Sequence, residues 1–180
     1  MAHAQETQAR PTLLSGCARA STAAEARYRI SGREFTDRSS RVIALDPWAA
    51  AVIVDVAAGS WHGGHFLVFE SALPDDALLR RAPLKTGGQN GTTALLSEEL
   101  DGADTVIMVA SARGSTAAAS LIGDAAAARG IMSAGLVLAG PAPLEASPDR
   151  IVSALRPNAM VLVILGDTTD LGAVLAALRV

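Results

Sequence analysis

The short loop Arg113-Gly114-Ser115-Thr116 contains the residue types of this chain that best suit binding of an anion. It follows a strongly apolar run that ends at Ala110 and precedes an alanine-rich stretch with helical character. The free N–H groups and the dipole at a helix N-terminus attract negative charge. A Ser or Thr at such a place is also an ordinary helix N-cap. The sequence leaves both interpretations of Ser115 and Thr116 open.

Two histidines, His62 and His65, flank Gly63-Gly64 and suggest a metal site. They supply at most two ligands where zinc takes three or four, and the only carboxylate close in sequence is Glu70, so we expect no bound metal. Either ring can act as an acid or a base, but no nucleophile partner is recognisable. Cys17 is far in sequence from any such base and is not expected to be a nucleophile. No catalytic residue is assigned.

Two further features have both a functional and a structural interpretation. Lys85–Gly91 is polar and rich in glycine, which suits a loop that closes over a ligand and equally an ordinary turn. Trp48 and Trp61, the two tryptophans, fall near predicted loops, so one of them can be a contact for a protein partner. We expect at least one of them to pack in the core, because indole rings are mostly buried.

Strands and helices are expected to alternate along the chain and to position these residues. Apolar runs rich in strand formers predict strands over Val42–Leu45, His65–Phe69, Thr105–Ala110, Ser133–Ala139 and Ala159–Leu165. Capping residues and stop signals predict helices over Asp46–Ala58, Thr92–Leu100, Ala117–Arg129, Pro148–Leu155 and Thr169–Leu178. A long connection is expected between Pro74 and Gly91.

This alternation predicts an α/β fold, a three-layer Rossmann-like parallel sheet with helices on both faces. Aromatic residues make up only 3% of the chain, so the core must consist of small, closely packed aliphatic side chains. Ligands of such sheets bind beyond the carboxyl ends of the strands. Function is therefore to be sought in the loops after Leu45, Phe69, Ala110, Ala139 and Leu165.

Composition divides the chain into a flexible basic N-terminal tail, residues 1–40, and an α/β domain, residues 41–180. Residues 1–41 contain seven Arg and four acidic residues, whereas the remainder contains eight basic and fourteen acidic residues. An acidic domain without a basic stripe is a poor surface for a phosphate backbone, so nucleic acid is not an expected partner.

The expected setting is the cytoplasm, without a membrane anchor. Cys17 is the single cysteine, so no intramolecular disulfide can form. Leu14-Ser15-Gly16-Cys17 resembles a bacterial lipoprotein box, but no apolar signal segment precedes it. No uninterrupted apolar stretch reaches the ~20 residues that a membrane span needs.

Several segments between about residues 41 and 170 match, in order, the pattern of one family. They are Arg41–Ala44 with Asp46–Ala58, Phe66–Leu79, Leu100–Ala110, Ala117–Met132 and Leu155–Asp167. Leu100–Ala110 is similar to the strand that leads into the tubulin signature, and the chain resembles the nucleotide-binding half of the FtsZ/tubulin family. The resemblance implies a GTP-binding ancestry for the loops that follow Leu45 and Ala110.

The glycine loops of that family are not intact in this chain. Ser111-Ala112-Arg113-Gly114-Ser115-Thr116-Ala117 stands where the family has G-G-G-T-G-T-G, and Asp46-Pro47-Trp48-Ala49-Ala50 stands where several glycines are expected. A phosphate-wrapping loop needs backbone N–H groups turned inward, which glycine permits. Asp46 adds a negative charge and Pro47 has no N–H to donate. We therefore expect degenerate GTP-binding loops and no cofactor, the alternative being a weakly bound nucleotide.

The leading hypothesis is a non-catalytic protein-interaction or self-assembly module, acting as a homo-oligomer or with another protein. The chain also ends before the family's guanine-contacting helix, so a subunit of a larger complex is a further possibility. The alternative is a small-ligand-binding protein or enzyme that uses the strand-end crevice. In that case Arg113, Ser115, Thr116, His62 and His65 are the candidate contacts, in a pocket joining the loops after Phe69 and Ala110. This alternative depends on fold position alone, and whether the chain is an enzyme is left open.

Overall fold

The strand β1 (Ser40–Ala44) is the central strand of the sheet, and all five of its residues are buried. The computed structural model describes residues 38–82, 91–139 and 148–180. β1 pairs in parallel with β2 (Gly64–Ala72) on one side and with β5 (Thr105–Ser111) on the other. Val42, Ile43 and Ala44 suit a strand that is buried on both faces, whereas Ser40 and Arg41 are buried polar residues at its start.

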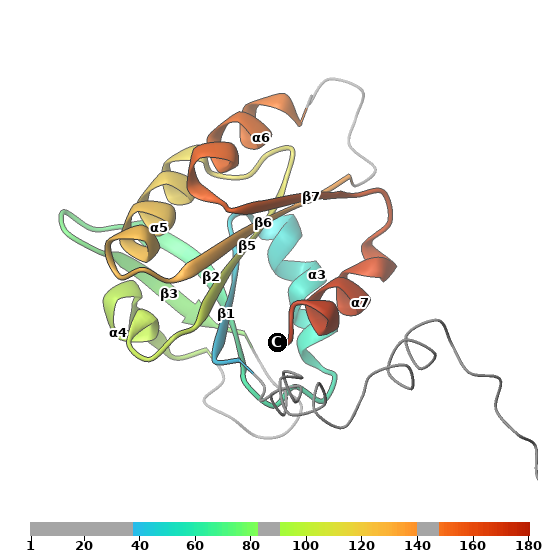
Figure 1. Cartoon of the computed structure of the whole chain (residues 1–180), viewed down its shortest axis with the longest axis horizontal. Coiled ribbons are helices and arrows are strands. Elements are labelled where there is room, and N and C mark those ends of the chain that lie inside the picture. Colours follow the sequence, from blue (N-terminus) through green and yellow to red (C-terminus); the bar gives the residue numbers. More distant parts are fainter. Residues whose placement is uncertain (1–37, 83–90, 140–147) are drawn as a thin grey trace, which may run out of the picture. The chain divides into compact units, whose positions relative to one another are not determined.

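The sheet has seven strands in the order β4-β3-β2-β1-β5-β6-β7, as Figure 1 shows. β2, β1, β5, β6 and β7 are parallel, whereas β3 and β4 are joined to β2 as an antiparallel meander. The bounds of the remaining strands are β3 (Ala77–Arg81), β4 (Thr93–Leu95), β6 (Met132–Leu138) and β7 (Val161–Leu165).

Helices cover both faces of this sheet, so the predicted α/β, three-layer Rossmann-like class is confirmed. Figure 1 shows the two helical layers: α3 and α7 cover one face of the sheet, and α4, α5 and α6 cover the other. The helix bounds are α3 (Pro47–Ala57), α4 (Leu96–Leu100), α5 (Thr116–Ala128), α6 (Asp149–Leu155) and α7 (Leu171–Ala177). Two short 3-10 helices, η1 (Arg156–Asn158) and η2 (Thr168–Asp170), flank β7.

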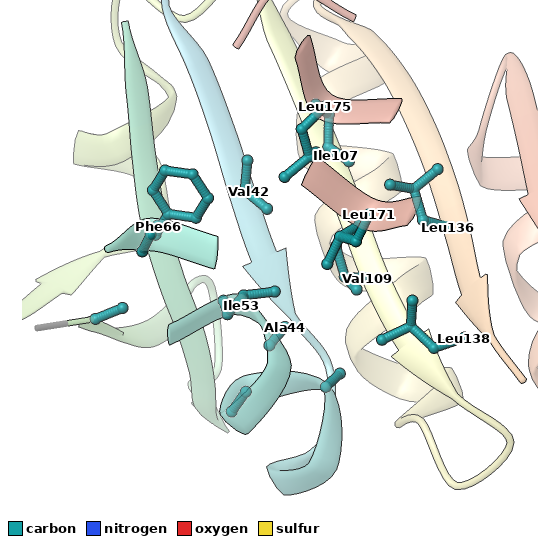
Figure 2. Packing of buried hydrophobic residues seen from close by; sticks show 14 of the residues in the cluster. Val42, Ala44, Ile53, Phe66, Ile107, Val109, Leu136, Leu138, Leu171 and Leu175 are labelled. Carbon is teal, nitrogen blue, oxygen red and sulfur yellow. The ribbon is translucent and has the colours of Figure 1, made fainter. Parts of the chain in front are cut away.

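The core on the α3 and α7 face is purely aliphatic apart from Phe66 and the partly buried tryptophans. Figure 2 shows Ile53 of α3 and Leu171 and Leu175 of α7 packed on the residues of β1, β5 and β6 that point to this side. Trp61 packs on the same cluster, with its ring centroid 5.6 Å from that of Phe66. Trp48 is also partly buried there, which confirms the expectation that at least one indole packs in the core.

In the opposite core, α5 contributes mainly small residues. Ala118, Ala119 and Ala126 are buried together with Ile122 against strand residues that alternate with those of the first core. Alanine on the inner face lets a helix lie close to a sheet of valines and isoleucines, so dense packing needs few large side chains.

The connection expected between Pro74 and Gly91 is wrong in part, because it contains β3. Pro74 does not break the sheet: the N–H of Leu73 donates to the carbonyl of Asp76 at 2.8 Å, so the antiparallel pairing of β2 with β3 continues up to the Pro74-Asp75 connection. The helix expected over Thr92–Leu100 begins only at Leu96, after the short strand β4. The mostly parallel sheet accordingly carries an antiparallel meander at one edge.

Some predictions fall outside the described residues. The first 37 residues of the predicted tail, with Cys17, and residues 85–90 of the candidate loop belong to this group. The described residues all lie in one compact unit, Asp37–Val180.

Candidate functional site

The carboxyl ends of β1 and β5 form the edge at which a ligand of this fold class is expected. The connection after β1 leads to α3 on one face, and the connection after β5 leads to α5 on the other. Neighbouring strands whose connections diverge in this way form the crevice that open α/β sheets use for binding. The structure thus brings Leu45 and Asp46 beside the predicted loop Arg113–Thr116.

Asp46 occupies the N-terminus of α3 with its own side chain. Its Oδ1 accepts hydrogen bonds from the backbone N–H groups of Trp48, at 3.1 Å, and Ala49, at 3.0 Å. The backbone of Asp46 is extended and Pro47 begins the helix, so the predicted cap and helix start are confirmed. The orphan N–H groups that would attract an external anion are therefore satisfied within the protein.

The second carboxylate oxygen of Asp46 reaches the end of β5. Oδ2 accepts a hydrogen bond from the N–H of Ser111 at 2.7 Å, and the residue as a whole is only 7% exposed. One buried carboxylate consequently joins both of the corners that the FtsZ/tubulin resemblance assigns to phosphate-binding loops.

The N–H groups of the loop Arg113–Thr116 are also largely used inside the protein. The N–H of Arg113 donates to Ser111 Oγ at 3.1 Å, that of Gly114 to the Ser111 carbonyl at 2.9 Å, and that of Ser115 to the Leu45 carbonyl at 3.2 Å. An anion-binding nest needs successive N–H groups that point at the ligand. Three such groups here point at protein oxygens instead.

Ser115 is the N-cap of α5, as its structural interpretation predicted. Its Oγ accepts a hydrogen bond from the N–H of Ala118 at 3.1 Å, and Thr116 is the first residue of the helix. The side chain of Arg113 is exposed. Binding of a ligand by Arg113, Gly114, Ser115 and Thr116 stays a prediction.

Gly114 is required by packing rather than by an unusual backbone angle. A Cβ at this position would lie 2.7 Å from the Cβ of Ala110 and 3.0 Å from Cδ1 of Ile151. The loop lies close against the end of β5 and against α6, and a residue without a side chain is needed at position 114 for this contact.

The two histidines lie at the opposite edge of the sheet. His65 is at the start of β2, beside Arg41 at the start of β1, whereas Arg113 follows the end of β5. A single site that combines His62 and His65 with Arg113, Ser115 and Thr116 is therefore wrong, because parallel strands carry their two ends to opposite edges.

At that opposite edge the structure contains a charged cluster that sequence reasoning missed. Glu99 and Arg41 are buried, and they contact the partly exposed side chains of Arg81 and His65. The Glu99 side chain is 1% exposed, and its Oε1 contacts Arg81 Nη2 at 2.6 Å. Its Oε2 lies 2.9 Å from Nδ1 of His65 and 3.4 Å from Nε of Arg41. Arg41 Nε also donates to the Glu99 backbone carbonyl. The four residues tie α4 to β1, β2 and β3.

Burial and pairing act in opposite directions on the pKa of Glu99. Burial by itself raises the pKa, but hydrogen bonds and charges from His65 and Arg81 outweigh it, so the pKa of Glu99 is lowered from its ordinary value. Burial lowers the pKa of Arg41, an effect that the charge of Glu99 opposes. Glu99 is therefore ionised at neutral pH and paired with the guanidinium groups of Arg41 and Arg81.

One signal of this cluster is visible in the sequence. Glu99 lies three residues after Leu96 and one before Leu100, so the helix period places it on the apolar side of α4. An acid on the buried side of a helix needs a cation, yet nothing in the sequence shows that Arg41 and Arg81 converge on it from other strands.

Neither a metal centre nor a membrane segment is found in the described part of the chain. Among residues 38–82, 91–139 and 148–180, no three His, Cys, Asp or Glu side chains are grouped so that they can hold a metal ion. None of the helices described there combines the length and the apolar character needed to cross a bilayer.

Comparisons with known proteins identify no family for the chain. No protein-family model matches the chain, and no curated protein matches it significantly. Among solved structures it is similar to the conserved hypothetical protein BatB from Bacteroides thetaiotaomicron. The identity is 13%, the match covers 77% of this chain and 95% of that chain, and the TM-score is 0.42.

Proposed function

We propose that this domain is a non-catalytic protein-interaction or self-assembly module, a divergent relative of the FtsZ/tubulin nucleotide domain with degenerate GTP-binding loops. The observation that carries the proposal is the buried carboxylate of Asp46, bonded at once to the start of α3 and to the end of β5. A triphosphate at this edge would meet a negative charge where it needs N–H donors.

The neighbouring loop supports the same proposal. Three consecutive N–H groups from Arg113 to Ser115 are satisfied by protein oxygens, and Gly114 is in close contact with Ala110 and Ile151. Opening this loop for a nucleotide would break these bonds and leave buried groups unpaired, at a cost of roughly 1–3 kcal/mol for each group. A scaffold closed in this way is better suited to presenting its surface to another protein.

The proposed setting is the cytoplasm. It is supported by the single cysteine in 180 residues, which cannot form an intramolecular disulfide.

Equilibrium binding of labelled GTP, GDP and ATP to the full chain tests the proposal. We expect no saturable binding with a dissociation constant below about 1 mM, so any binding of a mononucleotide should be weaker than roughly 4 kcal/mol. The Asp46→Asn variant, which removes the charge and keeps the shape, is expected to bind no better, because the N–H groups of the Arg113 loop stay occupied. Asp55→Asn, an exposed change on α3, is the matched control. Submillimolar affinity of the unaltered chain for any of the three nucleotides would refute the proposal.

A further inference from the structure

The strand β7 is an open edge of the sheet. Its five residues, Val161-Leu162-Val163-Ile164-Leu165, are all apolar, and of the strands that the structure describes only β6 pairs with it. Figure 1 shows it at the outer side of the sheet, between α6 and α7 in the chain. Val161 is 47% exposed and Ile164 is 56% exposed, although both belong to a strand without a charge.

The outer side of β7 presents backbone hydrogen-bonding groups. The carbonyl of Leu165 accepts from Ala139, so the odd-numbered residues of the strand face β6. Backbone groups alternate along a strand, and the N–H and C=O of Leu162 and Ile164 therefore point away from the sheet. Among the strands that the structure describes, none lies on this outer side to pair with these groups.

Apolar surface continues beyond the N-terminal end of the strand. Met160 is 75% exposed and lines a hollow of about 490 Å³ together with Met132 and Pro157. Exposed apolar area beside an unpaired strand is a feature that natural proteins normally avoid at a free edge.

The opposite edge of the sheet contrasts with β7. β4 is only three residues long, and α4 with its two acidic residues follows it directly. A very short strand and nearby charges are standard protections against edge pairing. β7 contains no charged residue, no proline and no bulge. The β7 edge therefore lacks the protections against pairing with another strand that the β4 edge has.

We propose that a second copy of this chain pairs with β7 in antiparallel orientation, about a two-fold axis at Val163. The proposal rests on the proposed self-assembly function and names its surface and partner. A two-fold axis makes the edge complementary to itself, since each copy offers the same strand in the opposite direction. The two sheets would then form one continuous sheet.

Charge at the two ends of β7 favours the antiparallel orientation. Arg156 precedes the strand in η1, whereas Asp167 and Asp170 follow it. Antiparallel pairing brings Arg156 of one copy toward the acidic end of the other, and parallel pairing would place like charges side by side.

The register follows from the length of the strand. An axis at Val163 overlaps all five residues, and it sets Leu162 of one copy opposite Ile164 of the other as hydrogen-bonded pairs. Val163 faces its own equivalent in a non-hydrogen-bonded pair. The exposed Ile164 side chain is covered by Leu162 of the second copy, which is on the same face of the sheet.

The contact is small, so the dimer is expected to be weak. Five residues per copy with the flanking methionines bury less than the roughly 1,200 Å² of a standard stable interface. We therefore expect a dissociation constant in the micromolar range rather than an obligate dimer.

Sedimentation velocity of the full chain from about 1 to 500 μM tests the association. We expect a monomer–dimer equilibrium, and Ile164→Lys is expected to raise its dissociation constant at least tenfold while circular dichroism stays unchanged. Leu73→Lys, at an exposed leucine in the hairpin turn, is the matched control and is expected to leave the equilibrium as it is. A monomer at every concentration, or equal effects of the two lysines, would overturn the proposal.

Cysteine cross-linking tests the orientation in a Cys17→Ser background, which removes the single native thiol. Val163→Cys should form a disulfide-linked dimer under mild oxidation, because the paired Cα atoms lie about 4.5–5.5 Å apart across the axis. Val161→Cys should not, because antiparallel pairing separates its two copies by about 14 Å along the strand. Cross-linking of both variants, or of neither, would contradict the antiparallel register.

The outcomes separate this inference from the proposed function. A chain that binds no nucleotide and stays monomeric refutes pairing through β7 and leaves a role in binding other proteins intact. If the chain forms a dimer linked at Val163→Cys and also binds GTP with a submillimolar dissociation constant, pairing through β7 is supported. The non-catalytic assignment is then refuted.

Discussion

The backbone N–H of Ser111 donates to Oδ2 of Asp46 at 2.7 Å, although 65 residues separate the two in the chain. The bond joins the ends of two neighbouring parallel strands through a side chain rather than through the ladder. Because the other oxygen of the same carboxylate caps α3, one residue fixes the strand end, the helix start and the following loop together. This edge is held by internal hydrogen bonds and has few donors left for a ligand.

Removal of the Asp46 carboxylate is expected to destabilise the domain. Asp46→Ala loses the N-cap of α3 and leaves the buried N–H of Ser111 without an acceptor, so the free energy of unfolding should fall by about 2–3 kcal/mol. Urea denaturation measures the change. Asp55→Ala, an exposed position on the same helix, should change stability by less than about 0.5 kcal/mol. Equal stability of the two variants would show that the bonds of Asp46 are not important for folding.

Neutralising Glu99 is expected to have a larger effect. Glu99→Gln leaves Arg41 buried without its counter-charge, and loss of one partner of a buried ion pair lowers the free energy of unfolding by about 3 kcal/mol. Chemical denaturation at neutral pH provides the measurement. The neighbouring Glu98 is exposed, so Glu98→Gln serves as control and should have little effect. A stable Glu99→Gln protein would mean that the cluster contributes little to stability.

Acid is expected to remove the contribution of Glu99. Its pKa in the folded protein is lowered from the ordinary value of 4.5, so the folded state binds its proton less readily than the unfolded state does. The stabilisation is therefore complete above the unfolded pKa and is lost as the pH falls through the folded pKa. Unfolding free energies of the unaltered protein between pH 7 and pH 3 should fall below about pH 4.5. For Glu99→Gln, the unfolding free energy should fall less steeply with decreasing pH. Identical pH dependence of the two proteins would show that groups other than Glu99 cause the acid sensitivity.

Adding a methyl group at Gly114 is expected to strain the loop. Gly114→Ala would bring its Cβ to 2.7 Å from Ala110 and 3.0 Å from Ile151, and overpacking of this kind costs about 1–3 kcal/mol. Gly166 follows β7 and has open space around the same position, so Gly166→Ala should be neutral within about 0.5 kcal/mol. Thermal unfolding of the two variants compares them directly. No loss of stability in Gly114→Ala would show that the loop relaxes away from α6.

Apolar runs, capping residues and stop signals were enough to predict the parallel strands and most of the helices. Val106–Ala110 is apolar at every position, as is typical of a strand buried on both faces. Asp46-Pro47 predicted the start of α3 because capping depends on adjacent residues. The expectation of one long connection from Pro74 to Gly91 missed β3, because Pro74 lies in the short connection after β2 and β3 begins at Ala77.

The sequence by itself determined the class of fold and the helix cap at Asp46, because each depends on residues near one another in the chain. Only the tertiary structure decided that Ser115 caps α5, that Asp46 bonds to Ser111, that Glu99 contacts Arg41, Arg81 and His65, and that β7 is an edge strand among the strands described. These relations depend on which strands become neighbours and in which register. That choice is made by the packing of the whole sheet, and local propensity does not encode it.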